Sequence, residues 1–509
     1  MAERYRETER KYDVDEAFEL PVLAGSDPVV GVHGPVEEVL DATYYDTADH
    51  RLAAARTTLR RRTGGVDAGW HLKLPVSDGT RDEVRVPLDG EGAALPPELA
   101  SLSRGVTRGR EVAPVVRLRT ARSVYRLTGT DPSGAEVTLA EVSDDRVVAQ
   151  GMSLGLEILA WREVEVELVD GDAEVLDAVE RLLRRAGAVP SSSGSKLARA
   201  LGRPRRVAGR GSGPRRKSPA GDVVGAHVRE QVERLTGHDP RVRLDDPDAV
   251  HQMRVASRQL RSVLGAYRPL FDREITEPIR DELKWLAGVL GAARDAEVMH
   301  ERLRGLVAAE PDGLVLGPVL ARIDAELTSR YRDAHAEVIA ALDGERYLAL
   351  LTSLDALVDT PPLTDVAAGR AADVLPRRVR RMWVRVRDAA AAVGAAAPEH
   401  RDEALHEVRK AAKRARYASE AVTSVFGSDA TSFARRMKDV QGVLGDQHDS
   451  VVTRAELRAM ASRAFLAGEN GFTFGRLHAH EQAEGQELAG AYAEIWSDAA
   501  RKKYRRWLR

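Results

Sequence analysis

The sequence contains no cysteine among its 509 residues. Without cysteine the chain can form neither disulfide bonds nor thiolate metal sites, and it has no cysteine nucleophile, which fits a reducing compartment. No apolar run approaches the roughly 20 residues of a membrane-spanning helix, and the first ten residues, MAERYRETER, do not resemble a signal peptide. We therefore predict a cytoplasmic protein without a membrane partner.

Aromatic residues are also few, and the charges nearly balance. Phe, Trp and Tyr make up 5% of the chain, while 77 Lys and Arg face 79 Asp and Glu, for a net charge of −2. With 43% apolar and 31% charged residues, the composition is that of a globular protein. At roughly 150 residues per domain, the length predicts two to four folded units.

A basic segment rich in Gly, Pro and Ser divides the chain. Residues 201–218 read LGRPRRVAGRGSGPRRKS, with seven basic residues and no acidic one. Upstream, short alternating segments between Gly, Pro and Asp turns are typical of strands, whereas downstream apolar residues recur at the spacing of helices. We predict an α+β protein of two domains, residues 1–201 and 221–509, joined by a linker at residues 202–220.

Charged residues recur at every second position of the predicted strands. Glu7, Glu9 and Lys11 form one such set, and Glu163 and Glu165 belong to another. Because successive side chains of a strand point to opposite faces, each set lies on one face. These faces either meet solvent or, if the sheet closes, line a tunnel. A tunnel with both signs suits a polyphosphate: Arg and Lys bind phosphate oxygens, and clustered carboxylates hold a divalent cation.

Together these motifs resemble the CYTH family, the triphosphate tunnel metalloenzymes, over about residues 7–201. The family's opening Glu-x-Glu-x-Lys motif is present at residues 7–11, and residues 44–62 and 70–73 resemble its later blocks. The resemblance implies an N-terminal eight-stranded antiparallel β tunnel with flanking helices that cleaves triphosphates with Mg²⁺ or Mn²⁺. The site residues that it implies are catalytic Glu7, Glu9 and Lys11; triphosphate-binding Arg60, Arg62, Lys73, Arg85, Arg122 and Lys196; and metal-binding Glu7, Glu9, Asp145, Glu163 and Glu165.

The helical half contains an internal repeat. The stretch HQMRVASRQLR from His251 recurs as HEVRKAAKRAR from His406, an offset of 155 residues. KWLAGVLGAARD from Lys284 recurs as KDVQGVLGDQHD from Lys438, an offset of 154 residues. Two elements in the same order predict two pseudo-repeated four-helix bundles about a pseudo-twofold axis. The paired glycines of the second element are expected to allow close helix approach or a helix break.

Each repeat also carries a basic stripe. Helix positions 0, +3, +7 and +10 fall within about an 80° arc, so the four basic residues of each copy share a face. One such stripe alone is most simply a solvated helix face, but its recurrence indicates a polyanion site shared by both repeats. The scarcity of aromatic residues for base stacking, and the absence of a nucleic-acid motif, disfavour nucleic acid.

This half resembles the CHAD domain, a helical module associated with inorganic polyphosphate, over about residues 221–509. The resemblance implies polyphosphate binding and recruitment to polyphosphate granules. The polyphosphate-binding residues that it implies are His251, Arg254, Arg258, Arg261, Lys284, Arg294, His406, Arg409, Lys413, Arg416, Lys438 and His448. The basic surroundings of the two stripe histidines make metal ligation the less favoured interpretation.

Our main hypothesis is a metal-dependent triphosphatase acting on inorganic tripolyphosphate or a related triphosphate, with a helical domain that binds polyphosphate. Adenylate cyclase activity, hydrolysis of nucleoside or thiamine triphosphate, and a non-catalytic polyphosphate-binding adaptor stay open as alternatives. The enzymatic alternatives would use the same metal and phosphate ligands, so residue types do not separate them, and in the adaptor the tunnel would only hold a phosphate chain. The basic C-terminal segment, residues 501–509, is expected to be a solvated terminus.

Overall fold

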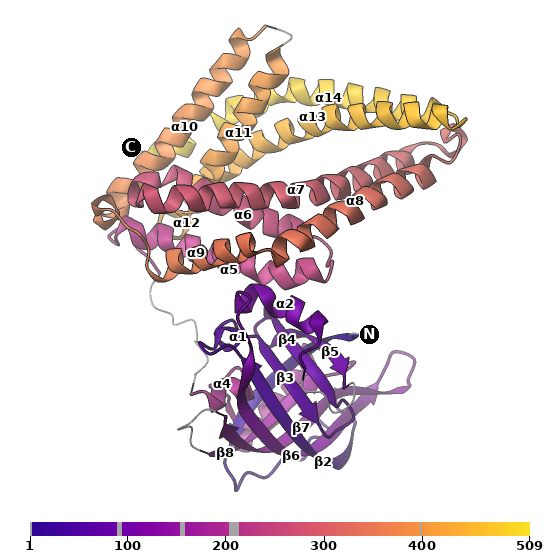
Figure 1. Cartoon of the computed structure of the whole chain (residues 1–509), viewed down its shortest axis with the longest axis vertical. Helices are drawn as coiled ribbons and strands as arrows, with labels where there is room; N and C mark the ends of the chain where they lie inside the picture. The colour runs from indigo at the N-terminus through magenta and orange to yellow at the C-terminus, as the bar shows by residue number, and fades with distance from the viewer. Residues whose placement is uncertain (1–2, 89–93, 153–157, 203–212, 398–399, 509) are drawn as a thin grey trace. The chain divides into compact units, whose positions relative to one another are not determined.

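The computed structural model describes residues 3–88, 94–152, 158–202, 213–397 and 400–508. The chain divides into two compact units between residues 209 and 210, the first built mainly of strands and the second of helices (Figure 1). This confirms the predicted α+β class. Residues 203–212 of the predicted linker lie outside the described residues. Among the helices of the described ranges, none is both long and apolar enough to cross a membrane.

The first unit is a closed antiparallel barrel, as predicted. Its strands are β1 (Glu3–Val14), β2 (Gly31–Asp46), β3 (Thr58–Thr63), β4 (Gly69–Ser77), β5 (Thr80–Pro87), β6 (Ala113–Thr130), β7 (Glu136–Gly151), β8 (Leu159–Leu168) and β9 (Val189–Pro190). The order is β5-β4-β3-β2-β6-β7-β8-β1-β9, and a further pairing of β1 with β5 closes eight strands into a ring. Closure gives the alternating charged residues an interior to line.

Four helices flank the barrel: α1 (Arg51–Ala54), α2 (Pro97–Thr107), α3 (Ala173–Arg185) and α4 (Lys196–Ala200). The apolar face of α3 packs on the outer face of the sheet, where Val179 and Leu183 meet Val164 and Val166 of β8 in one buried cluster. In β8 these two valines alternate with the glutamates, so the outward burial of the valines turns the glutamates inward. Burial of apolar side chains outside the barrel thereby orients the charged interior.

The second unit is all helical. Its helices are α5 (Ala220–Arg243), α6 (Ala249–Ala266), α7 (Arg273–Ala309), α8 (Val319–Asp343), α9 (Glu345–Asp359), α10 (Ala371–Ala395), α11 (Arg401–Glu420), α12 (Thr423–Phe426), α13 (Ser428–Leu466) and α14 (Phe472–Ala499), with 3₁₀ helices η1 (Arg268–Leu270), η2 (Asp312–Leu314), η3 (Asp365–Ala368) and η5 (Lys502–Leu508). The repeated elements fall on α6 and α7 and again on α11 and α13, which confirms the predicted repeat.

Both repeats share one hydrophobic core. A single buried cluster includes apolar residues of α5, α6, α7, α10, α11 and α13. A second cluster joins the distal halves of two long hairpins, α7 with α8 and α13 with α14, whose tips meet in Figure 1. Ion pairs reinforce this second contact: Arg302 of α7 binds Glu481 of α14 at 2.9 Å, and Arg463 of α13 binds Glu326 of α8 at 2.7 Å. The two repeats therefore form one folded unit.

The last part of the predicted linker belongs to the helical unit. The backbone amide of Ala371 donates to the carbonyl of Ser218 at 2.9 Å, and that of Ala372 donates to the carbonyl of Arg216 at 3.0 Å. These bonds tie the segment before α5 to the start of α10. The described helical unit accordingly begins several residues before the first helix.

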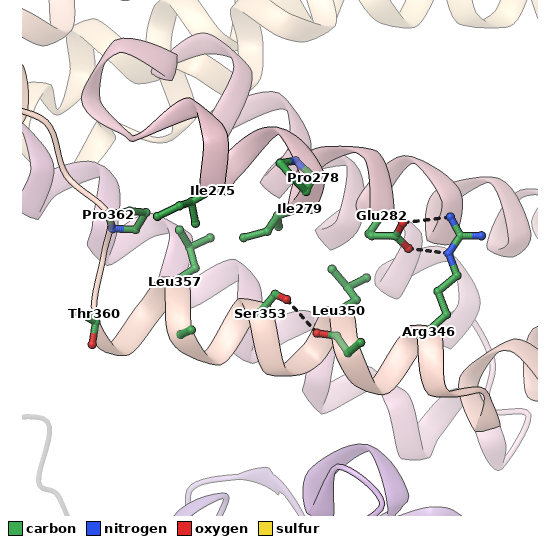
Figure 2. A pocket seen from close by; sticks show the side chains of 12 residues that line it. Ile275, Pro278, Ile279, Glu282, Arg346, Leu350, Ser353, Leu357, Thr360 and Pro362 are labelled. Carbon is green, nitrogen blue, oxygen red and sulfur yellow. Dashed lines mark hydrogen bonds and ion pairs between the residues drawn. The ribbon is translucent and has the colours of Figure 1, made fainter.

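The C-terminal segment is folded, so the expectation of a solvated terminus was wrong. Leu508 of η5 is 3% exposed, and the ring of Trp507 lies 5.0 Å from that of Phe426. The two apolar side chains, Trp507 and Leu508, anchor the segment to the core, although basic residues predominate in its sequence. In the first repeat, an apolar pocket of about 570 Å³ lies between α7 and α9 and is lined by Ile275, Ile279 and other residues (Figure 2).

Replacing Trp507 by Ala should destabilise the helical unit by about 2 kcal/mol, because it removes aromatic contacts with Phe426 and Phe433. The thermal midpoint of this unit should fall by several degrees in calorimetry. Phe465→Ala is the matched control, because Phe465 is 77% exposed and its loss should change the midpoint little. Equal midpoints for the Trp507 variant and the wild type would contradict a docked C-terminus.

Candidate functional site

Three carboxylates converge inside the barrel from two neighbouring strands. Asp145 of β7 lies opposite Glu163 of β8 in the register, and Glu165 lies two residues further along β8. One oxygen of each carboxylate lies within 4.8 Å of the other two. Asp145 is fully buried and Glu163 is 3% exposed, so these charges depend on protein partners rather than on bulk water.

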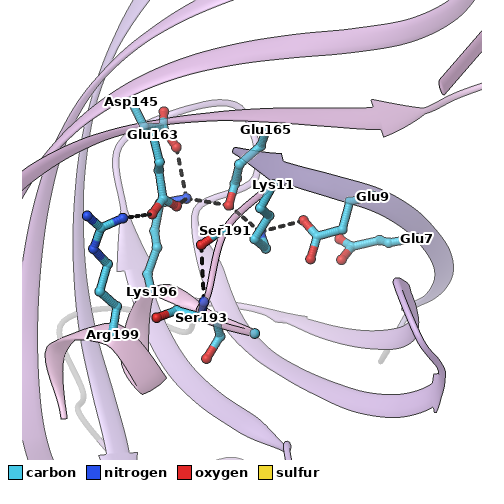
Figure 3. Close-up of polar contacts among 12 residues, drawn as sticks. Glu7, Glu9, Lys11, Asp145, Glu163, Glu165, Ser191, Ser193, Lys196 and Arg199 are labelled. Carbon is cyan, nitrogen blue, oxygen red and sulfur yellow. Dashed lines mark hydrogen bonds and ion pairs between the residues drawn. The ribbon is translucent and has the colours of Figure 1, made fainter. Parts of the chain in front are cut away.

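A lysine ammonium lies among these three carboxylates. Lys196 Nζ is 2.9 Å from Asp145, 2.8 Å from Glu163 and 2.6 Å from Glu165 (Figure 3). Lys196 is the first residue of α4, where the Ser195 side chain accepts a hydrogen bond from the amide of Ala198 and so fixes the start of the helix. This helix start places a cation at the centre of an anionic cluster.

Arg122 of β6 approaches the same cluster from the side. Its guanidinium forms two 2.7 Å hydrogen bonds to Asp145 and a third, of 3.1 Å, to Glu165. Burial acts to raise the pKa of Asp145, but Lys196 and Arg122 outweigh it and lower the pKa. For Glu165, burial acts the same way, and Lys11, Lys196 and Arg122 lower the pKa well below its usual value. Both carboxylates are therefore charged at neutral pH.

The chemistry of this cluster fits a hard divalent cation. It offers only carboxylate oxygens, the donors that Mg²⁺ and Mn²⁺ prefer, and the carboxylates are already close together around a positive charge. A divalent cation would share or take the place now held by the Lys196 ammonium. The residues Asp145, Glu163 and Glu165 could therefore hold such an ion.

The other two predicted metal ligands lie on β1 and pair with lysines. Glu9 binds Lys11 Nζ at 2.7 Å, and Glu7 binds Lys73 Nζ at 2.5 Å. Burial acts to raise the pKa of Glu9, but Lys11 and other cations lower it to about 2, whereas burial keeps the pKa of Glu7 raised. Lys11 also binds Glu165, so Lys11 connects Glu9 to the three-carboxylate cluster.

Predicted phosphate-binding cations gather on strands β3 to β5 around Glu83, a carboxylate with no exposed surface. Arg60 and Lys73 each have a nitrogen 3.6 Å from Glu83, and Arg85 donates to it directly. Although burial acts to lower the pKa of Lys73, Glu83 and Glu7 raise it. Glu83 thus holds three cations on the inner face of the barrel.

Arg62, another predicted phosphate-binding residue, has a lowered pKa, whereas the pKa of the neighbouring Arg60 is raised. Burial, together with the positive charges of Arg60 and Arg122, lowers its pKa to about 9. Its guanidinium pairs with Asp67. An incoming phosphate would relieve the repulsion among these arginines, which favours anion binding at this position.

The sequence analysis missed several residues of the barrel interior. His71 Nδ1 lies 2.9 Å from Glu83, and His71 is almost completely buried beneath the cations. Arg81 of β5 has a nitrogen 3.7 Å from Glu9, and Arg199 of α4 lies 3.8 Å from Glu163. For Arg81 the signal was present, since it alternates with residues 83 and 85 on the same strand.

Glu167 has an unusual charge state. Burial, followed by repulsion from Glu7, raises its pKa to about 7. In the register it lies opposite both Glu9 of β1 and Glu141 of β7. The barrel therefore holds one carboxyl group whose pKa of about 7 is close to neutral pH, whereas the pKa of the facing Glu9 is lowered to about 2.

In the helical unit, the two predicted basic stripes lie on helices that contact each other, α6 and α11. Arg254 and Arg258 of α6 face Arg409 and Lys413 of α11 closely enough to perturb one another electrostatically. We call these four residues the cation cluster. Within the described residues, Arg258, Arg409 and Lys413 form no ion pair with a carboxylate, and the nearest carboxylate pairing of Arg254 is 3.6 Å from Asp295.

The pKa of Lys413 reflects the positive charges that surround it in the cation cluster. Burial, and then the charges of Arg258, Arg409 and Arg254, lower its pKa to about 6. Clustered cations without carboxylate partners destabilise a fold unless an anion binds them. The cation cluster therefore has the properties of an anion site.

The other predicted residues of the helical unit differ in their partners and burial. The rings of His406 and His448 lie 5.0 Å apart, while Arg294 binds Glu297 at 2.8 Å and Arg416 binds Glu420 at 2.7 Å. Arg261 and His251 have pKa values lowered mainly by burial. Lys284 and Lys438 are exposed on α7 and α13.

Comparison with known families matches the two units separately. The CYTH domain model matches residues 5–201, and the CHAD domain model matches residues 226–458. Uncharacterized proteins from two strains of Mycobacterium tuberculosis are 40% identical to this chain over 491 residues, which cover 94% of this chain and 93% of theirs.

Two solved structures are similar to part of the chain. PptA from Streptomyces chartreusis is 25% identical with a TM-score of 0.47, and the match covers 55% of this chain and all of that one. The CHAD domain from the plant Ricinus communis is 24% identical with a TM-score of 0.45, and the match covers 55% of this chain and 93% of that one.

Proposed function

The chain belongs to the family of proteins that join a CYTH domain to a CHAD domain, and from this premise we propose that it is a metal-dependent triphosphatase whose helical unit binds inorganic polyphosphate. CYTH proteins are often metal-dependent triphosphatases or cyclases, so an enzyme of this kind is supported. One observation carries the proposal: the barrel interior combines a cluster of three carboxylates with cations on several strands that are partly or fully shielded from solvent.

The cations of the interior would bind the phosphate chain. Arg60, Lys73 and Arg85 lie around Glu83, while Arg122 and Lys196 lie at the carboxylate cluster. A triphosphate spanning these groups would exchange their carboxylate partners for phosphate oxygens, with charge-assisted hydrogen bonds along its length. The interior would thereby orient the chain and exclude bulk water from the bond to be cleaved.

Asp145, Glu163 and Glu165 would hold the divalent cation. When bound, such an ion supplies Lewis-acid activation of the phosphoryl group and neutralises its negative charge. In hydrolysis, the water oxygen forms a bond to phosphorus, the bridging P–O bond breaks with its electron pair going to the leaving phosphate, and the proton that the water loses passes to the leaving phosphate or to solvent. Lys11, held between Glu9 and Glu165, would stabilise the negative charge that develops.

Tripolyphosphate is the substrate we favour, because both units would then act on the same chemical class. The cation cluster would bind long-chain polyphosphate while the barrel cleaves short chains. ATP cyclisation would use the same metal and phosphate ligands, so the products must separate the two reactions.

The test offers tripolyphosphate, ATP and long-chain polyphosphate separately to the purified protein with Mg²⁺ or Mn²⁺. We expect orthophosphate and pyrophosphate from tripolyphosphate. Cyclic AMP from ATP would establish a cyclase instead. Absence of turnover with all three, while polyphosphate still binds, would establish a non-catalytic adaptor.

Polyphosphate binding should be accompanied by proton uptake at Lys413. Because its pKa is lowered to about 6, this side chain is mostly neutral at pH 7.5, and a bound polyanion would raise the pKa and protonate it. Affinity should therefore fall as pH rises above about 6. Calorimetry at pH 7.5 in buffers of different ionisation enthalpy should show about one more proton taken up by the wild type than by Lys413→Met. Equal uptake by the two proteins would contradict this assignment.

A further inference from the structure

Two arginines at equivalent positions of the repeats each lie across a glycine of the next helix. A Cβ atom added at Gly291 of α7 would be 3.6 Å from a terminal nitrogen of Arg254. A Cβ atom added at Gly445 of α13 would be 3.5 Å from Nε of Arg409. Both glycines are buried. The same contact occurs in both copies of the repeat, so it belongs to the architecture of the repeat.

The preceding glycine of each pair differs. Added Cβ atoms at Gly288 and Gly442 would meet nothing within 4 Å, and both positions are exposed. None of the four glycines has a positive φ, so the backbone conformation does not require glycine at any of them. Glycine at positions 291 and 445 leaves space in which the side chain of an arginine packs directly against the helix backbone.

The two guanidinium groups are held by packing more than by hydrogen bonds. In the described part of the chain, Nε of Arg254 and Nε of Arg409 are buried and have no hydrogen-bond partner. Arg409 forms no ion pair there, and Arg254 has only the 3.6 Å approach to Asp295. The N–H groups of both guanidinium groups therefore form no short hydrogen bond to a carboxylate in the described residues, which leaves them able to bind an anion.

We propose that Gly291 and Gly445 are positioning residues of the polyanion site. By presenting bare helix surface, each lets its arginine lie flat against the neighbouring helix in a fixed orientation before the ligand arrives. Preorganised cations lose less side-chain entropy on binding, so the glycines act on affinity through Arg254 and Arg409. Because equivalent arginines come from both repeats, the ligand is a linear polyanion that contacts both. This inference rests on the proposed binding of polyphosphate.

Side-chain size provides the test. An alanine at either position would make an ordinary contact at 3.5–3.6 Å and leave the arginine in place. A valine adds two carbon atoms to this Cβ, which must displace the guanidinium. The double variant Gly291→Val/Gly445→Val is therefore compared with Gly291→Ala/Gly445→Ala. The matched control is Gly288→Val/Gly442→Val. It changes helix propensity by the same amount, but the added side chains meet no neighbouring atom within 4 Å of the Cβ position.

The experiment measures the Kd of the full-length protein for long-chain inorganic polyphosphate at several salt concentrations, together with thermal midpoints. We expect the Val variant at residues 291 and 445 to lose about tenfold or more in affinity, with a weaker dependence on salt, because two cations no longer engage the polyanion. The Ala variant and the control should bind within about twofold of the wild type.

Three outcomes would overturn the inference. They are unchanged binding by the Val variant, an equal loss in the control, and a loss with unchanged salt dependence, which would indicate general disruption. Absence of binding by the wild type would overturn the proposed function itself. The wild-type measurement therefore separates failure of this inference from failure of polyphosphate binding.

Discussion

Replacing Asp145 by Asn, or Glu163 by Gln, should reduce the hydrolysis of tripolyphosphate by at least about 100-fold at a Mg²⁺ concentration that just saturates the wild type. Each substitution keeps the shape of the side chain but removes one of three carboxylates that lie within 4.8 Å of one another. Fewer anionic oxygen ligands would weaken the hold on a divalent cation, and with it the stabilisation of the phosphoryl group. Phosphate release under steady-state conditions measures the effect.

Binding of tripolyphosphate without metal should respond in the opposite direction. Arg122 and Lys196 remain in the variants, while one negative charge that repels phosphate is gone, so metal-free affinity should be equal or higher. Glu180→Gln is the control, because Glu180 belongs to the outer helix α3 and pairs with Arg10. Activity within twofold of the wild type in both tunnel variants would refute a catalytic role for the cluster.

The double variant Arg258→Gln/Lys413→Met should raise the Kd for long-chain polyphosphate by about 10- to 100-fold and leave tripolyphosphate hydrolysis unchanged. The two residues lie at equivalent positions of α6 and α11 and form no ion pairs within the described residues. Removing them takes two cations from the polyanion site without breaking a salt bridge. Titration with polyphosphate at several salt concentrations measures the loss.

The same variant should be at least as stable as the wild type. The pKa of Lys413 is lowered from the usual lysine value to about 6, so between pH 6 and about 10 the unfolded chain binds the proton that the folded chain lacks. Wild-type stability should therefore rise with pH across this window, and the variant should lack this contribution.

Lys410→Met is the matched control, because Lys410 lies on the same helix but is exposed and pairs with Glu407. It should change polyphosphate binding little. Weaker binding together with a lower melting temperature in the double variant would indicate that the residues support the fold rather than the ligand.

The fold was predictable where the spacing of apolar residues indicates which face of a strand or helix is buried. In β8, valines alternate with glutamates, so one face packs under α3 and the other faces the barrel interior. The repeat from His251 and from His406 likewise predicted two equivalent helices. The C-terminal segment was misread because its basic residues dominate the composition, whereas the contacts of Trp507 and Leu508 depend on tertiary packing.

The sequence predicted which charged residues share a strand face, but it did not predict which of them form ion pairs. Strand alternation placed Glu163 and Glu165 on one face, but their closeness to Asp145 depends on the register of β7 with β8. Glu7 and Glu9 pair with lysines, as the three-carboxylate cluster pairs with Lys196, and only the three-dimensional positions reveal these partners.

Buried supporting residues were the hardest to predict. His71 lies between residues of an apolar pattern, and its contact with Glu83 crosses from β4 to β5. Gly291 and Gly445 were expected to allow close helix approach or a helix break, but both lie within continuous helices, and the contact over each glycine comes from an arginine of another helix. Such roles follow from packing partners that are distant in sequence.

The most direct test of the account follows tripolyphosphate by ³¹P NMR in the presence of the purified protein and Mg²⁺, and then after a chelator is added. The account predicts that orthophosphate and pyrophosphate appear in equal amounts and that their formation stops on chelation. Tripolyphosphate that binds the protein but stays intact, with Mg²⁺ and with Mn²⁺, would contradict the central claim that the barrel is a metal-dependent triphosphatase.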